Sequence, residues 1–253
     1  MASSSVHHTA IVAAGARLGA GVDVGPYVVI EDDVEIGDEC RIGPHVVIHR
    51  QVRLGARNRL HAHAVIGGAP QDLSFKESDT WLVIGDDNVL REGVTIHRAT
   101  RTEHPTRIGS HCFLMAYAHV AHDCRLGDRV ILTNNVSLGG HVEIGDYCTL
   151  GGSAGVHQFV RIGAQAMVSA HALLRKDVLP FTLVGGEPVR HYRLNSVGLR
   201  RRGITGERYQ ALEQAFRALR EGADLGAVPT TPETELMRAW LARPSKRGIL
   251  GFV

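Results

Sequence analysis

Large aliphatic residues recur at every sixth position over most of the chain. Counting in steps of six from Val6 to Leu174 gives 29 positions, and 26 of them hold valine, isoleucine or leucine. Neither the 3.6-residue period of a helix nor the two-residue period of an ordinary strand would keep one phase for so long. A period of six is typical of a parallel β-helix whose coils have three flat sides. The sequence therefore predicts a mainly β fold, a left-handed parallel β-helix built as a hexapeptide-repeat prism.

The repeat also predicts how the coils pack. Three hexads make a coil of 18 residues, so residue i should lie over residue i+18 at a strand spacing of about 4.8 Å. Roughly nine coils would form a prism about 45 Å long. A glycine often follows the aliphatic residue, as at Gly37 and Gly55, and we expect it to permit the turn conformations. The slot two positions before each aliphatic residue holds small side chains, among them Cys40, Cys112, Cys124 and Cys148. These cysteines are expected to be buried and reduced, without disulfide or metal roles.

The repeat is interrupted at residues 68–82 and, more briefly, at 99–107. The three sixth positions without a large aliphatic residue are Asp72, Ser78 and Thr102. Both segments should loop out of the prism, and loops on a rigid scaffold are a usual place for binding groups.

The hexads stop after Leu174, and beyond residue 190 the apolar residues follow a helical period. A first helix is expected to present an apolar face of Tyr209, Leu212, Phe216 and Leu219, and Gly222 is its stop signal. A second should begin at Thr231, a cap followed by proline, with an apolar face of Leu236, Trp240 and Leu241. The chain is therefore divided into a β-helix domain, 1–189, and a small α-helical C-terminal subdomain, 190–253.

Composition adds few constraints. The 253 residues suffice for a sizeable core, and the formal charge of +2 gives no reason to expect a nucleic-acid partner. No apolar run reaches the roughly 18 residues of a transmembrane helix, and the N-terminus does not resemble a secretory leader. We therefore expect a soluble, cytoplasmic protein without a transmembrane segment.

The candidate chemistry centres on the segment "AHVAHDC", which contains His119, His122 and Asp123. One coil later, Gly140 is expected over His122, with His141 beside it, and open backbone at a glycine can offer an N–H to an oxyanion. A neutral imidazole near pH 7 can take a proton from a hydroxyl and return it to a leaving group, which suits acyl transfer. Asp123 can support His122 only if the pair lies at a turn, because adjacent strand residues point to opposite faces.

Two other interpretations of these histidines remain open. They could belong to a solvated polar face, or His97, His119 and His122 could hold a zinc ion between subunits. The His-x-x-His spacing is not on a helix and no zinc-type cysteine pair accompanies it, so no metal is expected.

Several motifs together resemble the acyl-[acyl-carrier-protein]:UDP-N-acetylglucosamine O-acyltransferases of lipid A and lipopolysaccharide synthesis. They are "GGAPQDL", "VTIHR", "AHVAHDC", "NNVSLGGHV", "GGSAGVHQF", "LNSVGLRRRG" and "SKRGI". The resemblance implies a homotrimer with a site between adjacent prisms, and no metal or organic cofactor. Its partners would be acyl carrier protein bearing an (R)-3-hydroxyacyl chain and UDP-N-acetylglucosamine, whose 3-hydroxyl would attack the thioester.

The resemblance also implies roles for single residues. His122 would be the general base, Asp123 its supporting acid and Gly140 the oxyanion donor. Contacts to the sugar and acyl chain would come from Asp72, His97, His119 and His141. The same cleft would be lined by Gln71 and His157, with Gln158 near the uracil. The nucleotide end would be bound by Asn195, Arg201 and Arg202, since guanidinium groups suit a diphosphate. Residue size at Ala170 would measure acyl length, with a medium-length chain weakly favoured.

The chain departs from the family pattern at one contact. The family commonly has a lysine where this chain has Ser74, and Lys76 follows two positions later. The alternative functions are N-acyl transfer to a 3-amino sugar nucleotide or to a UDP-acylglucosamine, and, more remotely, a zinc-dependent or noncatalytic β-helix protein.

Overall fold

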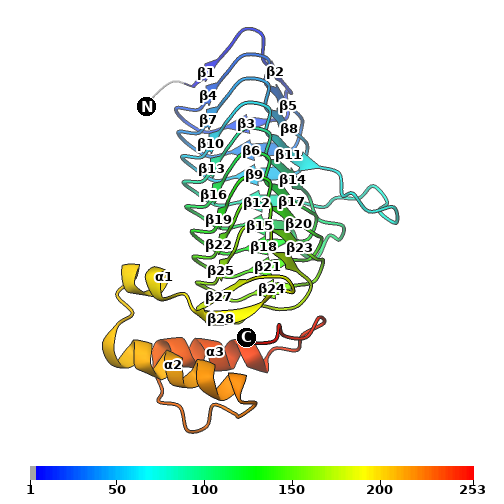
Figure 1. Cartoon of the computed structure of the whole chain (residues 1–253). Coiled ribbons are helices and arrows are strands. Elements are labelled where there is room, and N and C mark those ends of the chain that lie inside the picture. Colours follow the sequence, from blue (N-terminus) through cyan, green and yellow to red (C-terminus); the bar gives the residue numbers. More distant parts are fainter. Residues whose placement is uncertain (1–3) are drawn as a thin grey trace.

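A computed structural model describes residues 4–253 as a three-sided prism of stacked coils, with three helices at its C-terminal end (Figure 1). Each side is one parallel sheet of very short strands. We name the three sheets A, B and C. From β1 to β26, successive strands along the chain pass from sheet A to sheet B to sheet C and back to sheet A, so each coil contributes one strand to each side. The predicted parallel β-helix is confirmed, with about ten turns rather than nine.

Sheet A has eleven strands. In spatial order they are β1 (Ser5–Val6), β4 (Asp23–Val24), β7 (Arg41–Ile42), β10 (Arg59–Leu60), β13 (Val89–Leu90), β16 (Phe113–Leu114), β19 (Ile131–Leu132), β22 (Thr149–Leu150), β25 (Met167–Val168), β27 (Thr182–Gly185) and β28 (Arg190–Leu194). All neighbours are parallel except β27 and β28, which are antiparallel.

Sheets B and C have nine and eight strands. Sheet B consists of β2 (Ile11–Val12), β5 (Val29–Ile30), β8 (Val47–Ile48), β11 (Val65–Gly68), β14 (Thr95–His97), β17 (His119–Val120), β20 (Ser137–Leu138), β23 (Gly155–Val156) and β26 (Leu173–Leu174). Sheet C consists of β3 (Arg17–Leu18), β6 (Val34–Ile36), β9 (Val52–Leu54), β12 (Leu82–Ile84), β15 (Thr106–Ile108), β18 (Arg125–Leu126), β21 (Glu143–Ile144) and β24 (Arg161–Ile162). We name the turns between them the AB, BC and CA corners.

The pairing register shows where the repeat is lengthened. Most partners are 18 residues apart, as with Val6 and Val24. Leu60 instead pairs with Leu90, and Leu90 pairs with Leu114, so these two coils are longer. The extra residues are the two predicted loops. Both emerge at the BC corner, one between β11 and β12 and the other between β14 and β15, and the first projects well away from the prism (Figure 1).

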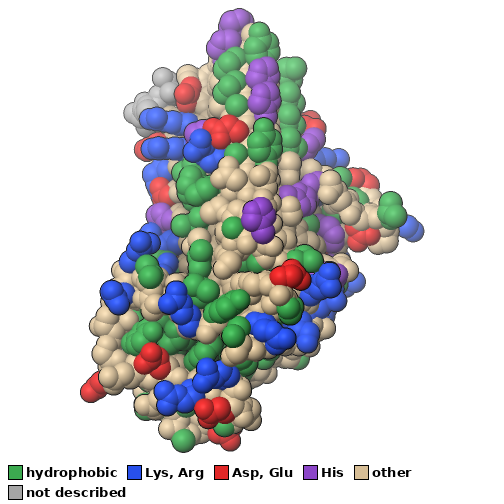
Figure 2. Space-filling view, in the orientation of Figure 1, with side chains coloured by type: hydrophobic (Ala, Val, Ile, Leu, Met, Phe, Trp, Pro, Cys, Tyr) green, Lys and Arg blue, Asp and Glu red, His purple; other side chains and the backbone are tan. Residues whose placement is uncertain are grey.

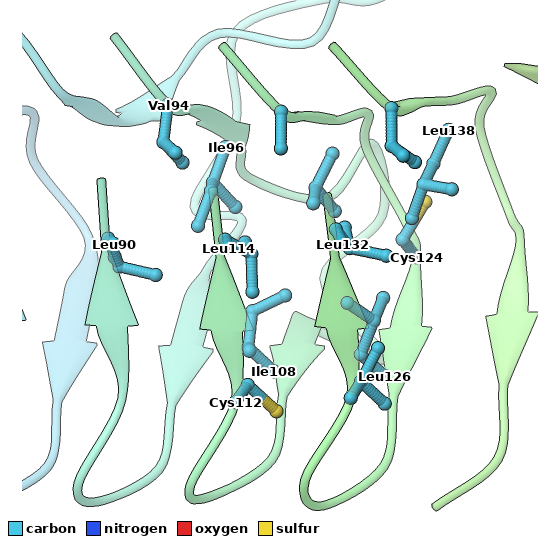
Figure 3. Close-up of a cluster of buried hydrophobic side chains, with 14 of the residues drawn as sticks. Leu90, Val94, Ile96, Ile108, Cys112, Leu114, Cys124, Leu126, Leu132 and Leu138 are labelled. Carbon is cyan, nitrogen blue, oxygen red and sulfur yellow. The ribbon is translucent and has the colours of Figure 1, made fainter. Parts of the chain in front are cut away.

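The aliphatic residues of the repeat fill the interior of the prism (Figure 3). Leu114 and Leu132, one coil apart, are fully buried, and burial of such a side chain contributes about 1.5–3 kcal/mol. All four cysteines are buried and unpaired, as predicted. Their thiols donate to backbone carbonyls one coil away, as Cys148 does to Gly163 at 3.0 Å. The small slot is therefore packing, without a disulfide.

The expectation that the repeated glycines permit turn conformations is wrong. The left-handed backbone at the corners is mostly adopted by other residues, for example Glu39 and Arg57, both with φ of 58°. The glycines at the CA corner are needed for close approach instead. A Cβ on Gly37 would lie 2.6 Å from the carbonyl carbon of Gly55 in the next coil. Adjacent coils thus touch through their backbones at this corner.

The C-terminal region closes one end of the prism. Its helices are α1 (Ser196–Arg201), α2 (Gly206–Arg220) and α3 (Pro232–Ala242). Strand β28 starts at residue 190, where the helical subdomain was expected to begin, and belongs to sheet A. The last residues return to the prism, since Ile249 forms a bridge with Asp177 and Phe252 with His191. Among the described residues, no helix is long and apolar enough to cross a membrane.

Helix α3 begins as the sequence predicts, with a capping box formed by Thr231 and Thr234. The prediction that Leu236 belongs to the buried apolar face of this helix is wrong. Leu236 is 40% exposed, whereas Met237 is fully buried and Trp240 is largely buried. Met237 packs with Phe216 of α2 in a second apolar cluster, because the buried face of α3 is rotated by one position.

Candidate active site

The segment singled out in the sequence lies at the BC corner in the middle of the prism. His119 is the first residue of β17, and the chain then turns through His122 and Asp123 before β18. Asp123 adopts a left-handed conformation with φ of 61°. The condition set by the sequence is met, because at a turn two adjacent side chains can meet.

His122 and Asp123 form a hydrogen-bonded pair. His122 Nδ1 lies 2.7 Å from Asp123 Oδ2, and each side chain is only 10% exposed. Burial acts to raise the pKa of Asp123, but the hydrogen bonds from His122 and Thr100 outweigh it and lower that pKa. An ionised carboxylate can only accept hydrogen bonds, so a neutral His122 that is bonded to it carries its proton on Nδ1. Nε2 is then left as an acceptor, the state that a general base requires.

Gly140 lies directly over the His122 ring, as the 18-residue coil predicts. A Cβ on Gly140 would lie 2.5 Å from Cε1 and 2.8 Å from Nε2 of His122, so only glycine leaves this space open. Within residues 4–253, the N–H of Gly140 donates to no protein acceptor. The reactive nitrogen and an available backbone donor therefore lie side by side.

His141 faces the same pair from the next coil. Its Nε2 is 3.6 Å from Asp123 Oδ2, and its ring stacks on Phe159 with centroids 4.5 Å apart. Nζ of Lys246, from the C-terminal tail, lies over the ring of Phe159, 4.5 Å from its centroid. Burial lowers the pKa of His141, with Asp123 opposing it. This histidine is therefore held largely neutral beside the catalytic candidates.

His97, one coil nearer the N-terminus, and His119, in the same coil as His122, form a second pair with ring centroids 5.2 Å apart. Burial lowers the pKa of both, and that of His119 falls to about 4, helped by the nearby His97 and His122. His97 Nδ1 donates to the carbonyl of Ala69 at 2.6 Å, which ties β14 to the start of the first loop. Both rings are neutral hydrogen-bonding groups at pH 7.

The first loop brings Asp72 near His122 and His141. Ser74 donates to Asp72 Oδ1 through its N–H at 2.8 Å and its hydroxyl at 2.7 Å. These bonds are the main reason that the pKa of Asp72 is lowered, and His122 and His141 contribute in the same direction. Ser74 therefore orients Asp72. Gln71 beside it is exposed.

A buried arginine anchors the same loop. Arg98 follows His97, and its guanidinium donates to Gln51 Oε1, to Thr80 Oγ1 and to the carbonyl of Ser78 at 2.9–3.1 Å. The end of the loop is thus fixed to the prism.

A recess of about 670 Å³ opens beside Asp123 and His141. Its walls come from the second loop, from sheet C and from the C-terminal tail. The basic residues that line it are Arg101, Arg125, Arg161, Arg243 and Lys246, and its acids besides Asp123 are Glu103 and Glu143. Figure 2 shows that histidines follow an edge of the prism and that basic side chains gather toward the helical end. The recess is therefore suited to an anionic or strongly polar ligand.

His157 and Gln158 lie one further coil along the same corner, and both are exposed. Arg247 from the tail donates through Nε to the carbonyl of Gln158 at 2.8 Å and lies 2.5 Å from His157 Nδ1. The tail motif "SKRGI" thus meets "GVHQF" in space.

The remaining candidates lie elsewhere in the chain. Asn195 caps α1, and with Arg201 and Arg202 it lines a separate recess of about 720 Å³ against sheet A. Arg202 stacks on Tyr147, 4.4 Å from the ring centroid, and its buried Nε has no partner among the described residues. Ala170 is exposed at the AB corner. A single chain therefore brings together the candidates of the BC corner but not these four residues.

Three residues that contact the site are not among the candidates named from the sequence. Thr100 and Thr106, near the two ends of the second loop, hydrogen-bond the side chain and the backbone of Asp123. Phe159 stacks on His141. Both threonines belong to the second interruption of the repeat, where the sixfold count does not place residues. Phe159 lies 18 residues after His141, so the coil period could have found it.

The three histidines of the zinc interpretation do not form a cluster within one chain. In the part of the chain that the structure describes, the one group of three ligand-type side chains whose atoms lie within 4.8 Å of one another is His122, Asp123 and His141. His97 and His119 do not join it. One chain by itself therefore does not bring His97, His119 and His122 together around a metal ion.

Comparisons with known proteins match this arrangement. The family model "Udp N-acetylglucosamine O-acyltransferase; Domain 2" matches residues 177–250, and "Bacterial transferase hexapeptide (six repeats)" matches 15–50, 33–68 and 105–140. An acyl-[acyl-carrier-protein]–UDP-N-acetylglucosamine O-acyltransferase of Thiobacillus denitrificans is 42% identical over 98% of this chain and 99% of its own length.

Solved structures agree with the sequence relatives. The UDP-N-acetylglucosamine acyltransferase of Campylobacter jejuni is similar with a TM-score of 0.91 and 33% identity, over 98% of this chain and 100% of that one. The corresponding enzyme of Bacteroides fragilis has a TM-score of 0.93 and 33% identity, over 97% of this chain and 100% of that one. The similarity extends over both the prism and the helical end.

Proposed function

The chain belongs to the acyl-[acyl-carrier-protein]–UDP-N-acetylglucosamine O-acyltransferase family, and from this premise we propose that it transfers an (R)-3-hydroxyacyl chain from acyl carrier protein to the 3-hydroxyl of UDP-N-acetylglucosamine in lipid A synthesis. The observation that carries the mechanism is the buried His122–Asp123 pair, whose ring faces the open backbone of Gly140.

The reaction has two proton transfers, one during attack on the thioester carbon and one during collapse of the tetrahedral intermediate. His122 Nε2 accepts the proton of the sugar hydroxyl while its oxygen attacks the thioester carbon. The carbonyl oxygen becomes an oxyanion and accepts the N–H of Gly140. When the tetrahedral intermediate collapses, the carbon–sulfur bond breaks and the imidazolium of His122 returns the proton to the departing thiolate. Asp123 holds the Nδ1 tautomer and stabilises the imidazolium, as the carboxylate of a catalytic triad does.

The neighbouring polar residues would bind the substrates. His97, His119 and His141 are kept largely neutral by burial, so each can both donate to and accept from sugar hydroxyls or the acyl carbonyl. Asp72, oriented by Ser74, lies near His122 and His141 and can accept a hydrogen bond from a hydroxyl. Gln71, His157 and Gln158 would line the rest of the cleft.

The nucleotide end would be bound by a second copy of the chain in a homotrimer. Asn195, Arg201 and Arg202 line the sheet A recess, away from the BC corner that carries His122. The unpartnered Nε of Arg202 suits a phosphate oxygen. Ala170, also outside that corner, would limit the acyl chain in the same interface. The molar mass in solution tests the trimer, and a cytoplasmic location stays a prediction.

The decisive experiment compares His122→Ala with the wild type in transfer from 3-hydroxyacyl carrier protein to UDP-N-acetylglucosamine. General acid–base catalysis contributes about 10²–10⁴-fold, so kcat should fall by at least about 10². His45→Ala is the control, because His45 is an exposed residue that stacks on Tyr27 and His63 at the AB corner. Undiminished transfer by His122→Ala would overturn the mechanism.

The same assay identifies the acceptor. Acyl chains of several lengths and the 3-amino analogue of the sugar are offered in parallel, and the product bond is tested with mild base, which cleaves an ester but leaves an amide. If the 3-amino sugar is the preferred acceptor and the product bond is an amide, the proposed O-acyl transfer is replaced by N-acyl transfer.

A further inference from the structure

The second loop, residues 99–107, closes around Asp123. At its start, Thr100 donates its hydroxyl to Asp123 Oδ2 at 2.7 Å and its N–H to Asp123 Oδ1 at 3.1 Å. At its end, the hydroxyl of the fully buried Thr106 accepts the N–H of Asp123 at 2.7 Å. The loop therefore binds both the side chain and the backbone of this one residue.

The carboxylate needs such an anchor because two imidazoles compete for it. Oδ2 lies 2.7 Å from His122 Nδ1 and 3.6 Å from His141 Nε2. The terminal torsion of an aspartate is broad, so a modest rotation could exchange one imidazole partner for the other. Arg101 and Arg125, which line the adjoining recess, would also attract an unanchored carboxylate.

The two bonds from Thr100 remove this freedom. The N–H of Thr100 binds Oδ1 and its hydroxyl binds Oδ2, so both oxygens of the carboxylate are held by one residue. This pair of bonds fixes the plane of the carboxylate. With that plane fixed, Oδ2 stays on His122, and the ring of His122 keeps both its tautomer and its orientation under Gly140. Hydrogen bonds to a charged group are stronger than neutral ones, which makes this restraint effective.

We propose that Thr100 is a positioning residue for acyl transfer: it holds the carboxylate of Asp123 on His122 and away from His141. The inference rests on the proposed role of His122 as general base. It gives the second interruption of the repeat a function, because Thr100 is carried by the residues that lengthen this coil.

Three variants test the proposal in steady-state kinetics. Thr100→Val keeps the shape and the N–H but removes the hydroxyl, and it should lower kcat at least about tenfold. KM for both substrates should stay within about twofold, since Thr100 acts through Asp123. Thr100→Ser restores the hydroxyl and should recover most of kcat. Thr102→Val, the same change at an exposed position of the same loop, should match the wild type.

A double-mutant cycle separates positioning from general support of the fold. In an Asp123→Asn background, Thr100→Val should cost less than about twofold in kcat, because the carboxylate that it positions is gone. Full additivity of the two losses, or a wild-type kcat for Thr100→Val, would overturn the inference. A wild type without transfer to UDP-N-acetylglucosamine would instead overturn the proposed function, so the two failures are distinguishable.

Discussion

A methyl group added at Gly140 would disturb the ring of His122 and little else. The Cβ of alanine would lie 2.5 Å from Cε1 of His122, whereas ordinary contacts begin at 3.4 Å. The ring would therefore have to move by about 1 Å, which is the scale of misplacement that can cost 10²-fold in rate. Gly140 does not have a positive φ, so the backbone accepts alanine without strain and retains its N–H.

The size of the effect follows from what moves. A shift of the ring stretches the 2.7 Å bond between His122 and Asp123 and displaces Nε2 from the acceptor hydroxyl. We expect Gly140→Ala to lower kcat by about 100-fold. Overpacking a buried site costs about 1–3 kcal/mol, so the protein should still fold, with the melting temperature lowered by several degrees.

The assay measures transfer from acyl carrier protein to UDP-N-acetylglucosamine at saturating substrate, together with thermal unfolding. Gly155→Ala is the matched control, since its Cβ would meet only Leu173 Cδ1 at 3.4 Å. A wild-type kcat for Gly140→Ala would refute the reasoning that this face of His122 must stay open. An equal loss in Gly155→Ala would contradict the link to His122.

Two further predictions concern stability. Burial lowers the pKa of His191 from 6.5 to about 4, so between these pH values the unfolded chain binds more protons than the folded one. The contribution of neutral His191 to the free energy of unfolding is complete above pH 6.5 and should fall by up to about 3 kcal/mol by pH 4. Urea unfolding across this range should give a shallower pH dependence for His191→Gln. Cys148→Ala should lower the free energy of unfolding by about 1 kcal/mol while kcat stays unchanged, because its buried thiol only packs and donates to Gly163; a large loss of turnover in the folded variant would contradict this packing role.

The interior of the prism could be predicted from the sequence because one period decides it. Every inward position repeats after six residues, so the buried state of Leu114 or Cys148 follows from counting alone. The same counting places Gly140 over His122, since both lie in coils of ordinary length. The structure therefore confirms the predictions that depend only on the coil period.

Other features depend on geometry that the period does not contain. The repeated glycines looked like turn residues, yet Gly37 is required by the approach of the next backbone. The pairing of His122 with Asp123 was conditional on a turn that only the coordinates display. Thr100 belongs to an interruption, where no spacing rule applies, so its contact with Asp123 could not be inferred.

The three corners of the prism also differ in the sequence changes that they can accept. At the CA corner a Cβ would come closer than 3.0 Å to the neighbouring coil at eight glycines, namely Gly19, Gly37, Gly55, Gly85, Gly109, Gly127, Gly145 and Gly163. The BC corner instead accommodates both insertions without a change in the phase of the coils. Mutational tolerance should therefore follow an 18-residue rhythm along the chain. Evolution, or an engineer, could exchange the loops at the BC corner to seek new acceptors, while the glycines of the CA corner admit almost no larger side chain.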